Sequence, residues 1–120
     1  MSRLVIAVVD DMFFASKIRA VAEAAGIEIN FARSREVLIE KARERQPQLI
    51  VVDLHHQKID AVALGKDLKS DPELTAIELL GFFSHVEIEL QRVAQAAGYD
   101  RVVPRSAFAR DLPNILTGNF

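Results

Sequence analysis

Three aspartates follow apolar runs of the sequence, and their type and spacing indicate a site for a cation. Asp10 and Asp11 come directly after the apolar residues 4–9, and Asp53 comes directly after residues 49–52. A strand that is apolar throughout is typical of a parallel sheet with helices on both faces. Side chains at the C-terminal ends of such strands face the crevice where open α/β sheets bind ligands. Because three clustered carboxylates repel one another, we expect a metal cation to join them there.

The rest of the chain supplies the elements that would position these acids, because strand-like and helix-like periodicity alternate along it. The expected strands cover about 4–9, 27–32, 48–54, 77–83 and 101–103, and the expected helices cover about 12–25, 34–45, 59–70, 84–97 and 106–116. Repeated βα alternation calls for a parallel sheet with right-handed crossovers and helices on both faces. We therefore expect one α/β domain over residues 1–120, with five strands in the flavodoxin-like order 2-1-3-4-5.

Local signals mark where these helices begin and end. Gly26 stands where a glycine commonly closes a helix, and Ser34 can cap the next one. The segment 84–87, Ser-His-Val-Glu, has the form of a capping box that opens the fourth helix. Pro113 is expected to interrupt the last helix, which is the weakest of the five.

Composition excludes several classes of protein. The chain has 120 residues, of which 50% are hydrophobic, and it has no cysteine. Disulfides, thiolate metal sites and thiol nucleophiles are therefore excluded. A formal charge of −2, with both signs interspersed, gives no sign of a nucleic-acid interface. No leader is recognisable and no apolar stretch reaches the roughly 18 residues of a membrane span, so we expect a cytoplasmic protein without membrane or nucleic-acid partners.

The order of the acidic, hydroxyl and basic residues at the ends of the expected strands resembles that of receiver domains of two-component response regulators. The resemblance covers nearly the whole chain. Asp10 and Asp11 are similar to the metal-binding acidic pair of that family, and Asp53 falls where the family carries its phospho-accepting aspartate. Ser84 stands at the position of the family's Thr or Ser, and Arg105 stands at that of an almost obligatory lysine. Each match alone is weak, but all of them follow expected strands in the family's order.

The resemblance implies a role for each residue. Asp53 would accept a phosphoryl group as an acyl phosphate, Ser84 would donate a hydrogen bond to that group, and Arg105 would pair with it. Any enzymatic activity would be limited to phosphoryl transfer to Asp53 and its hydrolysis.

The resemblance also implies Mg²⁺ as the cofactor. Asp10, Asp11 and Asp53 would hold the ion with the backbone carbonyl of His55, because Mg²⁺ prefers oxygen ligands and keeps several waters. The implied partners are a histidine kinase or phosphotransfer protein, a downstream protein and, as one option, a second copy of the chain. The docking surface expected for them lies on the helix at 84–97, the strand at 101–103 and the helix at 106–116.

Departures from the family's pattern keep a second hypothesis open. Arg105 replaces the lysine, Ser106 a common proline, Val102 a frequent aromatic residue and Ala61 a glycine. These changes are compatible with the fold, but they affect residues that the family uses to change conformation on phosphorylation. The first hypothesis is a phosphorylatable receiver, and the second is a pseudo-receiver that uses the same fold as an interaction module without phosphoryl chemistry.

Simpler structural interpretations also remain open for single residues. Asp11 or Asp10 could cap the following helix, and Asp60 is more typical of a helix N-cap than of a reactive group. Arg105 could form only a salt bridge, to Asp53 or to Asp11. His55 and His56 are interpreted as solvated loop residues.

The four phenylalanines at positions 13, 14, 82 and 83 are interpreted as core and helix-packing residues. Other α/β enzymes and cofactor-binding proteins fit less well. The sequence has no Walker loop or Gly-x-Gly-x-x-Gly motif, and no hydroxyl- and glycine-rich phosphate loop of the kind a flavodoxin would need after the first strand. Met12 stands where a haloacid-dehalogenase-like phosphatase would need a second acid.

Overall fold

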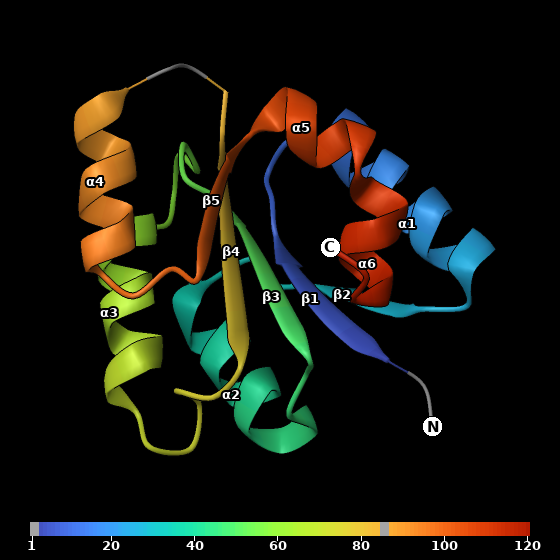
Figure 1. The fold of residues 1–120 in the computed structure, drawn as a ribbon. Coiled ribbons are helices and arrows are strands. Elements are labelled where there is room, and N and C mark those ends of the chain that lie inside the picture. The colour runs from blue at the N-terminus through green and yellow to red at the C-terminus, as the bar shows by residue number, and fades with distance from the viewer. Residues whose placement is uncertain (1–2, 85–86) are drawn as a thin grey trace.

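A computed structural model describes residues 3–84 and 87–120, and it confirms the expected sheet. Five parallel strands pair in the order β2-β1-β3-β4-β5 (Figure 1). The strands are β1 (Leu4–Val8), β2 (Glu28–Phe31), β3 (Leu49–Asp53), β4 (Glu78–Phe83) and β5 (Arg101–Pro104). The helices are α1 (Met12–Ala25), α2 (Arg35–Arg45), α3 (Ala61–Ser70), α4 (Ile88–Ala96), α5 (Arg105–Arg110) and α6 (Leu112–Thr117). No described helix is long and apolar enough to cross a membrane.

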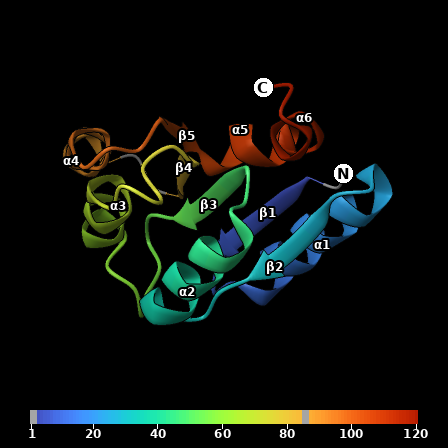
Figure 2. The same ribbon diagram turned by 90° about the horizontal axis from the view of Figure 1, so that it is seen from below.

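The helices cover both faces of the sheet, which explains why β1 and β3 are apolar throughout. Every residue of β1 and β3 is buried. One face packs against α1, α5 and α6, and the other packs against α2, α3 and α4. Figure 1 shows these two groups on opposite sides of the strands, and Figure 2 shows the strands as a single twisted layer. Burial on both faces removes the polar alternation that a half-exposed strand would show.

The register of the strands brings the candidate residues to one edge. Val8 lies opposite Val52 on β3, so Asp53 lies beside the last residues of the first apolar run. Asp53 lies opposite Phe82 on β4, and β4 in turn pairs with β5. The acids after β1 and β3, the serine after β4 and the arginine after β5 therefore all stand at the C-terminal edge of the sheet.

Three of the expected helix boundaries are confirmed by their hydrogen bonds. Gly26 closes α1 with a positive φ of 72°, a left-handed backbone that glycine adopts without steric cost. The side chain of Ser34 accepts the N–H of Val37 at 3.1 Å. Asp60 caps α3 by accepting the N–H of Ala63 at 3.0 Å, so its role here is structural.

Two boundaries differ from the sequence prediction. α4 begins only at Ile88, and its N-cap residue Glu87 makes no side-chain capping bond; the middle of the expected capping box, residues 85 and 86, lies outside the described residues. The interruption expected in the last helix is present, but it falls at Asp111, where two helices meet, and not at Pro113. Pro113 does not break either one, because it sits in the first turn of α6, where its missing N–H costs no helical hydrogen bond.

One aromatic assignment is wrong. Phe14, Phe82 and Phe83 are buried as expected, but Phe13 is 91% exposed. Phe14 and Phe13 are neighbours on a helix, so their side chains point about 100° apart and cannot both face the sheet. The helix turns Phe14 inward and leaves Phe13 in solvent.

Candidate functional site

Asp53 is the one charged residue that the fold buries within the described part of the chain. It is 6% exposed at the end of β3. Its Oδ1 accepts the N–H of His55 at 2.8 Å, which fixes the orientation of the carboxyl group. Burial raises the pKa of Asp53 above its usual value, and the nearby charge of Asp10 raises it further against the lowering effect of the His55 hydrogen bond. A buried carboxylate of this kind is costly unless a cation pairs with it and hydrogen bonds satisfy its oxygens.

Asp10 joins the end of β1 to the loop between β3 and α3. Its Oδ2 accepts the N–H of Gln57 at 3.2 Å and lies 3.9 Å from Nδ1 of His56. Asp10 also faces Asp53 closely enough for its charge to act on the Asp53 carboxyl. The structure thus brings together two of the three aspartates that the sequence singled out.

His56 is a structural part of this loop, which corrects the expectation of a solvated histidine. Its side chain is 3% exposed. Its Nδ1 accepts the N–H groups of Lys58 at 3.1 Å and Ile59 at 3.2 Å. A ring nitrogen that accepts two hydrogen bonds carries no proton, so this geometry assigns the proton to Nε2. His56 therefore orders the backbone that leads from Asp53 to α3, and His55 beside it is half-buried.

Asp11 contacts other partners than this pair, and its negative charge is balanced within the protein. Its Oδ1 accepts the N–H of Phe14 at 3.1 Å and so caps α1. Its Oδ2 accepts a hydrogen bond from the guanidinium of Arg105 at 2.8 Å. The Arg105 bond, and secondly the Phe14 N–H, hold the pKa of Asp11 below its usual value. Both structural interpretations left open by the sequence, a helix cap and a salt bridge to Arg105, are confirmed.

An aromatic cluster holds Arg105 in this position. The guanidinium carbon of Arg105 lies 4.2 Å from the ring centroid of Phe14. Phe14 lies 5.3 Å from the ring of Phe82 and 5.7 Å from that of Phe108, and the latter two rings are stacked at 4.7 Å. The planar guanidinium can stack on a ring and form an ion pair at once, which an ammonium does less well. The aromatic cluster is a feature that sequence reasoning missed, although the exact spacing of Phe14 on α1 signalled its burial.

Ser84 completes the set of residues at the edge. It follows β4 directly and is exposed. It lies two residues beyond Phe82, which is the register partner of Asp53 on the neighbouring strand. A hydroxyl at this point stands on the strand end next to that of Asp53, where it can serve as a hydrogen-bond donor to a group attached there.

The donor set fits Mg²⁺ with two carboxylates rather than three. Among the described residues, no three His, Asp or Glu side chains are arranged to hold a metal ion, and Asp11 uses both of its oxygens for Phe14 and Arg105. Mg²⁺ is commonly held by one or two carboxylates with waters in its other positions. Asp10 and Asp53 are hard oxygen donors of this kind. Their roles as ligands, and that of the His55 carbonyl, stay predictions.

Comparison with known proteins identifies the fold. No protein-family model and no curated protein matches the chain, but solved structures do. A signal receiver domain of a response regulator from Bermanella marisrubri is 18% identical, with a TM-score of 0.84 and 98% of each chain covered. The chemotaxis response regulator of Vibrio cholerae is 16% identical, with a TM-score of 0.84 and 100% of each chain covered. A phosphorylated cyanobacterial phytochrome response regulator is 20% identical, with a TM-score of 0.78 and coverage of 98% of this chain and 91% of that chain.

The chain has the receiver-domain fold. The expected five-stranded order and the resemblance noted in the sequence are confirmed at the level of architecture. Within this receiver fold, Asp53 is buried at the sheet edge with Asp10 nearby, while Asp11 and Arg105 form a separate ion pair. The edge therefore has two parts with different charge balance.

Proposed function

We propose that this chain is a two-component signalling receiver that accepts a phosphoryl group on Asp53 with the help of Mg²⁺. The burial of Asp53, with a raised pKa and no charged side chain hydrogen-bonded to it among the described residues, is the observation that carries the proposal. A structural turn aspartate has no need to be buried, whereas a nucleophile at a strand end does need a fixed orientation. The receiver-domain architecture supports the same role.

The residues around Asp53 have complementary tasks in this proposal. The carboxylate oxygen of Asp53 attacks the phosphorus of a phosphodonor, the bond to the donor's leaving group breaks, and an acyl phosphate remains on Asp53. The N–H of His55 holds the other oxygen in place. Ser84 donates a hydrogen bond to the transferred group, and Arg105 pairs with it after it leaves Asp11. Asp10 and Asp53 would hold Mg²⁺, which would supply positive charge to balance the phosphoryl oxygens.

The partners in this proposal are a histidine kinase or phosphotransfer protein upstream and a protein downstream. Output passes through the surface of α4, β5 and α5, because Ser84 and Arg105 stand at the start of these elements and a phosphoryl group there can bias their packing. The proposal includes a second copy of the chain as a partner that binds through the same surface. Substitutions at Arg92 or Gln95, which are both exposed on α4, should then alter association, whereas substitutions at exposed residues of α1 should not.

The test is phosphorylation by a small phosphodonor with Mg²⁺, followed by intact mass measurement. Wild-type protein should gain one phosphoryl group, and removal of Mg²⁺ by a chelator should abolish the gain. Asp53→Asn should not be modified. Asp60→Asn is the matched control, because asparagine keeps the N-cap of α3 and the residue lies in the same loop. The proposal would be excluded if the Asp53→Asn variant were phosphorylated. It would also be excluded if the wild-type protein were not phosphorylated.

One observation favours the second candidate function, a pseudo-receiver. The Asp11–Arg105 ion pair is supported by the Phe14 ring, so a fixed cation already balances part of the acidic edge without a metal. A protein in which Arg105 is held in this way can bind a partner without being phosphorylated. The pseudo-receiver holds if neither wild-type protein nor Arg105→Lys binds Mg²⁺ or forms an adduct.

A further inference from the structure

A groove of about 480 Å³ lies beside the acidic site, between α1, the end of β2 and the loop after β3. Its lining combines apolar side chains with three cations, Arg19, Arg33 and Lys58. Asp10 is the one carboxylate among the lining residues, so positive charge dominates the groove although the whole chain has a formal charge of −2. Apolar walls with a few converging charged groups are typical of sites for small molecules.

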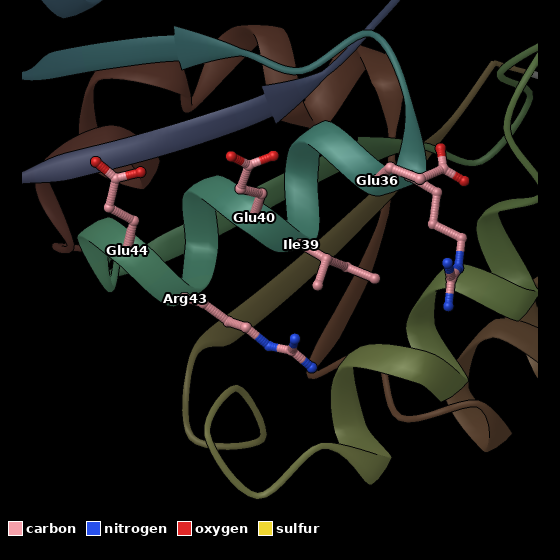
Figure 3. Close-up of a pocket in the computed structure, with 6 residues that line it drawn as sticks. Glu36, Ile39, Glu40, Arg43 and Glu44 are labelled. Atoms are coloured by element: carbon pink, nitrogen blue, oxygen red, sulfur yellow. The ribbon is translucent and has the colours of Figure 1, made fainter.

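A second groove shows how charged residues are arranged on an ordinary solvated face of this protein. It has about 560 Å³ and is lined by six residues of α2, namely Arg35, Glu36, Ile39, Glu40, Arg43 and Glu44 (Figure 3). Both of its cations are ion-paired, Arg35 with Asp67 and Arg43 with Asp71. In contrast, none of the ion pairs between described residues involves a cation of the first groove. The three cations of the first groove therefore have no ion-pair partner among the described residues and are accessible to an anionic ligand.

The apolar part of the first groove is suited to a flat ring. The guanidinium of Arg19 lies 4.8 Å from the ring centroid of Phe31, so this cation is held at the wall by stacking. Met12 at the rim is 82% exposed, and its flexible thioether makes favourable contacts with aromatic rings. Ala15 and Val9, which also line the groove, have short side chains that leave room for a ligand.

We propose that this groove binds a small organic anion that carries an aromatic ring. The ring lies against the apolar wall near Met12 and Ala15, and the phosphonate, phosphate or carboxylate group contacts Arg19, Arg33 and Lys58. Guanidinium groups bind such anions with paired N–H donors. An inorganic anion would leave the apolar wall in water, and a neutral ring would leave the cations unbalanced, so affinity requires both parts.

The proposal does not rest on phosphoryl transfer. The groove shares Asp10 and His56 with the candidate site, but the proposed ligand contacts neither Asp53 nor Mg²⁺. Binding should therefore persist in Asp53→Asn protein without Mg²⁺. Failure of the groove to bind and failure of Asp53 to react are separate results.

The test is an amide NMR titration of the full chain with three probes. Phenylphosphonate carries both the ring and the anion, and its carbon–phosphorus bond prevents phosphoryl transfer. Methylphosphonate lacks the ring, and benzyl alcohol lacks the charge. Phenylphosphonate should give saturable shifts at the amides of Ser16 and residues 31–33, and the other two probes should bind at least about tenfold more weakly.

Two variants and a matched control locate the binding. Arg19→Gln should weaken phenylphosphonate binding about tenfold, and Ser16→Phe should abolish it by filling the groove. Lys17→Gln removes a cation from the same helix outside the groove and should leave the affinity unchanged. Amide spectra and thermal melting show whether each variant is folded. Equal binding of methylphosphonate, an equal loss with Lys17→Gln, or shifts confined to Ser84 and Arg105 would overturn the proposal.

Discussion

Asp11 and Asp53 follow neighbouring strands of one sheet, but their charges are handled in opposite ways. Asp11 caps α1 and pairs with Arg105, and its pKa is lowered. Asp53 is buried next to Asp10, and its pKa is raised. The edge of the sheet thus has a part whose charge is balanced within the protein and a part, Asp10 and Asp53, for which we propose a bound cation. The balanced part is structural, and the unbalanced part is where binding and chemistry are expected.

The largest difference between the two parts should appear in Mg²⁺ affinity. Asp10→Asn should weaken Mg²⁺ binding about tenfold or more, because it removes one of the two carboxylates proposed to hold the ion. Asp11→Asn should have a smaller effect, because both oxygens of Asp11 are engaged by Phe14 and Arg105. Titration of each variant with Mg²⁺, followed by amide shifts, measures both affinities. A greater loss with Asp11→Asn would show that the Arg105 pair opens to let Asp11 bind the ion.

Replacement of Arg105 tests how strongly the Asp11–Arg105 ion pair opposes Mg²⁺ binding. Arg105→Lys should raise Mg²⁺ affinity about two- to fivefold and speed phosphorylation, because an ammonium stacks less well on Phe14 and releases the acidic edge. Arg110→Lys is the matched control, since Arg110 forms a similar ion pair with Asp111 on the surface of the same helix. Lower Mg²⁺ affinity in Arg105→Lys would mean that the guanidinium supports the site instead of competing with the ion.

The fold could be predicted well because it depends on local features. Apolar strands, the helical period of α1, and the caps at Gly26 and Ser34 each follow from neighbouring residues. The later start of α4 was not predicted. Residues 84–87 have the pattern of a capping box, but α4 begins only at Ile88 and Glu87 makes no side-chain capping bond. An interruption of the last helix was predicted from Pro113, but its position was not, because Pro113 fits the first turn of α6 and the two helices meet at Asp111.

The site was predicted only in part, for a physical reason. Parallel strands end at the same edge, so the positions of Asp53 and Arg105 follow from the order of the elements. Which acid Arg105 contacts depends on the Phe14 ring, which comes from a helix 91 residues away in the chain. The burial of His56 depends in the same way on backbone N–H groups of a folded loop. Contacts of this kind have no periodic signature in a sequence.

Stability should change in opposite directions when the two carboxylates are removed. At pH 7 without Mg²⁺, Asp53→Asn should stabilise the protein by about 1 kcal/mol, because a neutral amide avoids the cost of the buried charge and still accepts the His55 N–H. Asp11→Asn keeps a good helix cap but loses a partly exposed ion pair, so it should destabilise the protein by about 0.5 kcal/mol. Urea unfolding measures both values. Changes of the same sign would end the distinction between the two parts.

The smallest expected effect is the pH dependence of these two differences, and its sign follows from the pKa directions. The folded pKa of Asp53 is raised above 3.8, so the folded state binds its proton first and gains stability as pH falls from 7 toward 3.8. The advantage of Asp53→Asn over the wild-type protein should therefore shrink across that range.

The folded pKa of Asp11 is lowered below 3.8, so its contribution is complete above that value and is lost only as pH falls further. The difference between wild-type protein and Asp11→Asn should stay constant from pH 7 to about 4.5 and shrink below 3.8. Urea unfolding of the wild-type protein and both variants over pH 3–7 separates the two windows. A single shared window would show that the Asp11 and Asp53 carboxyl groups titrate as one coupled pair instead of independently in two parts of the edge.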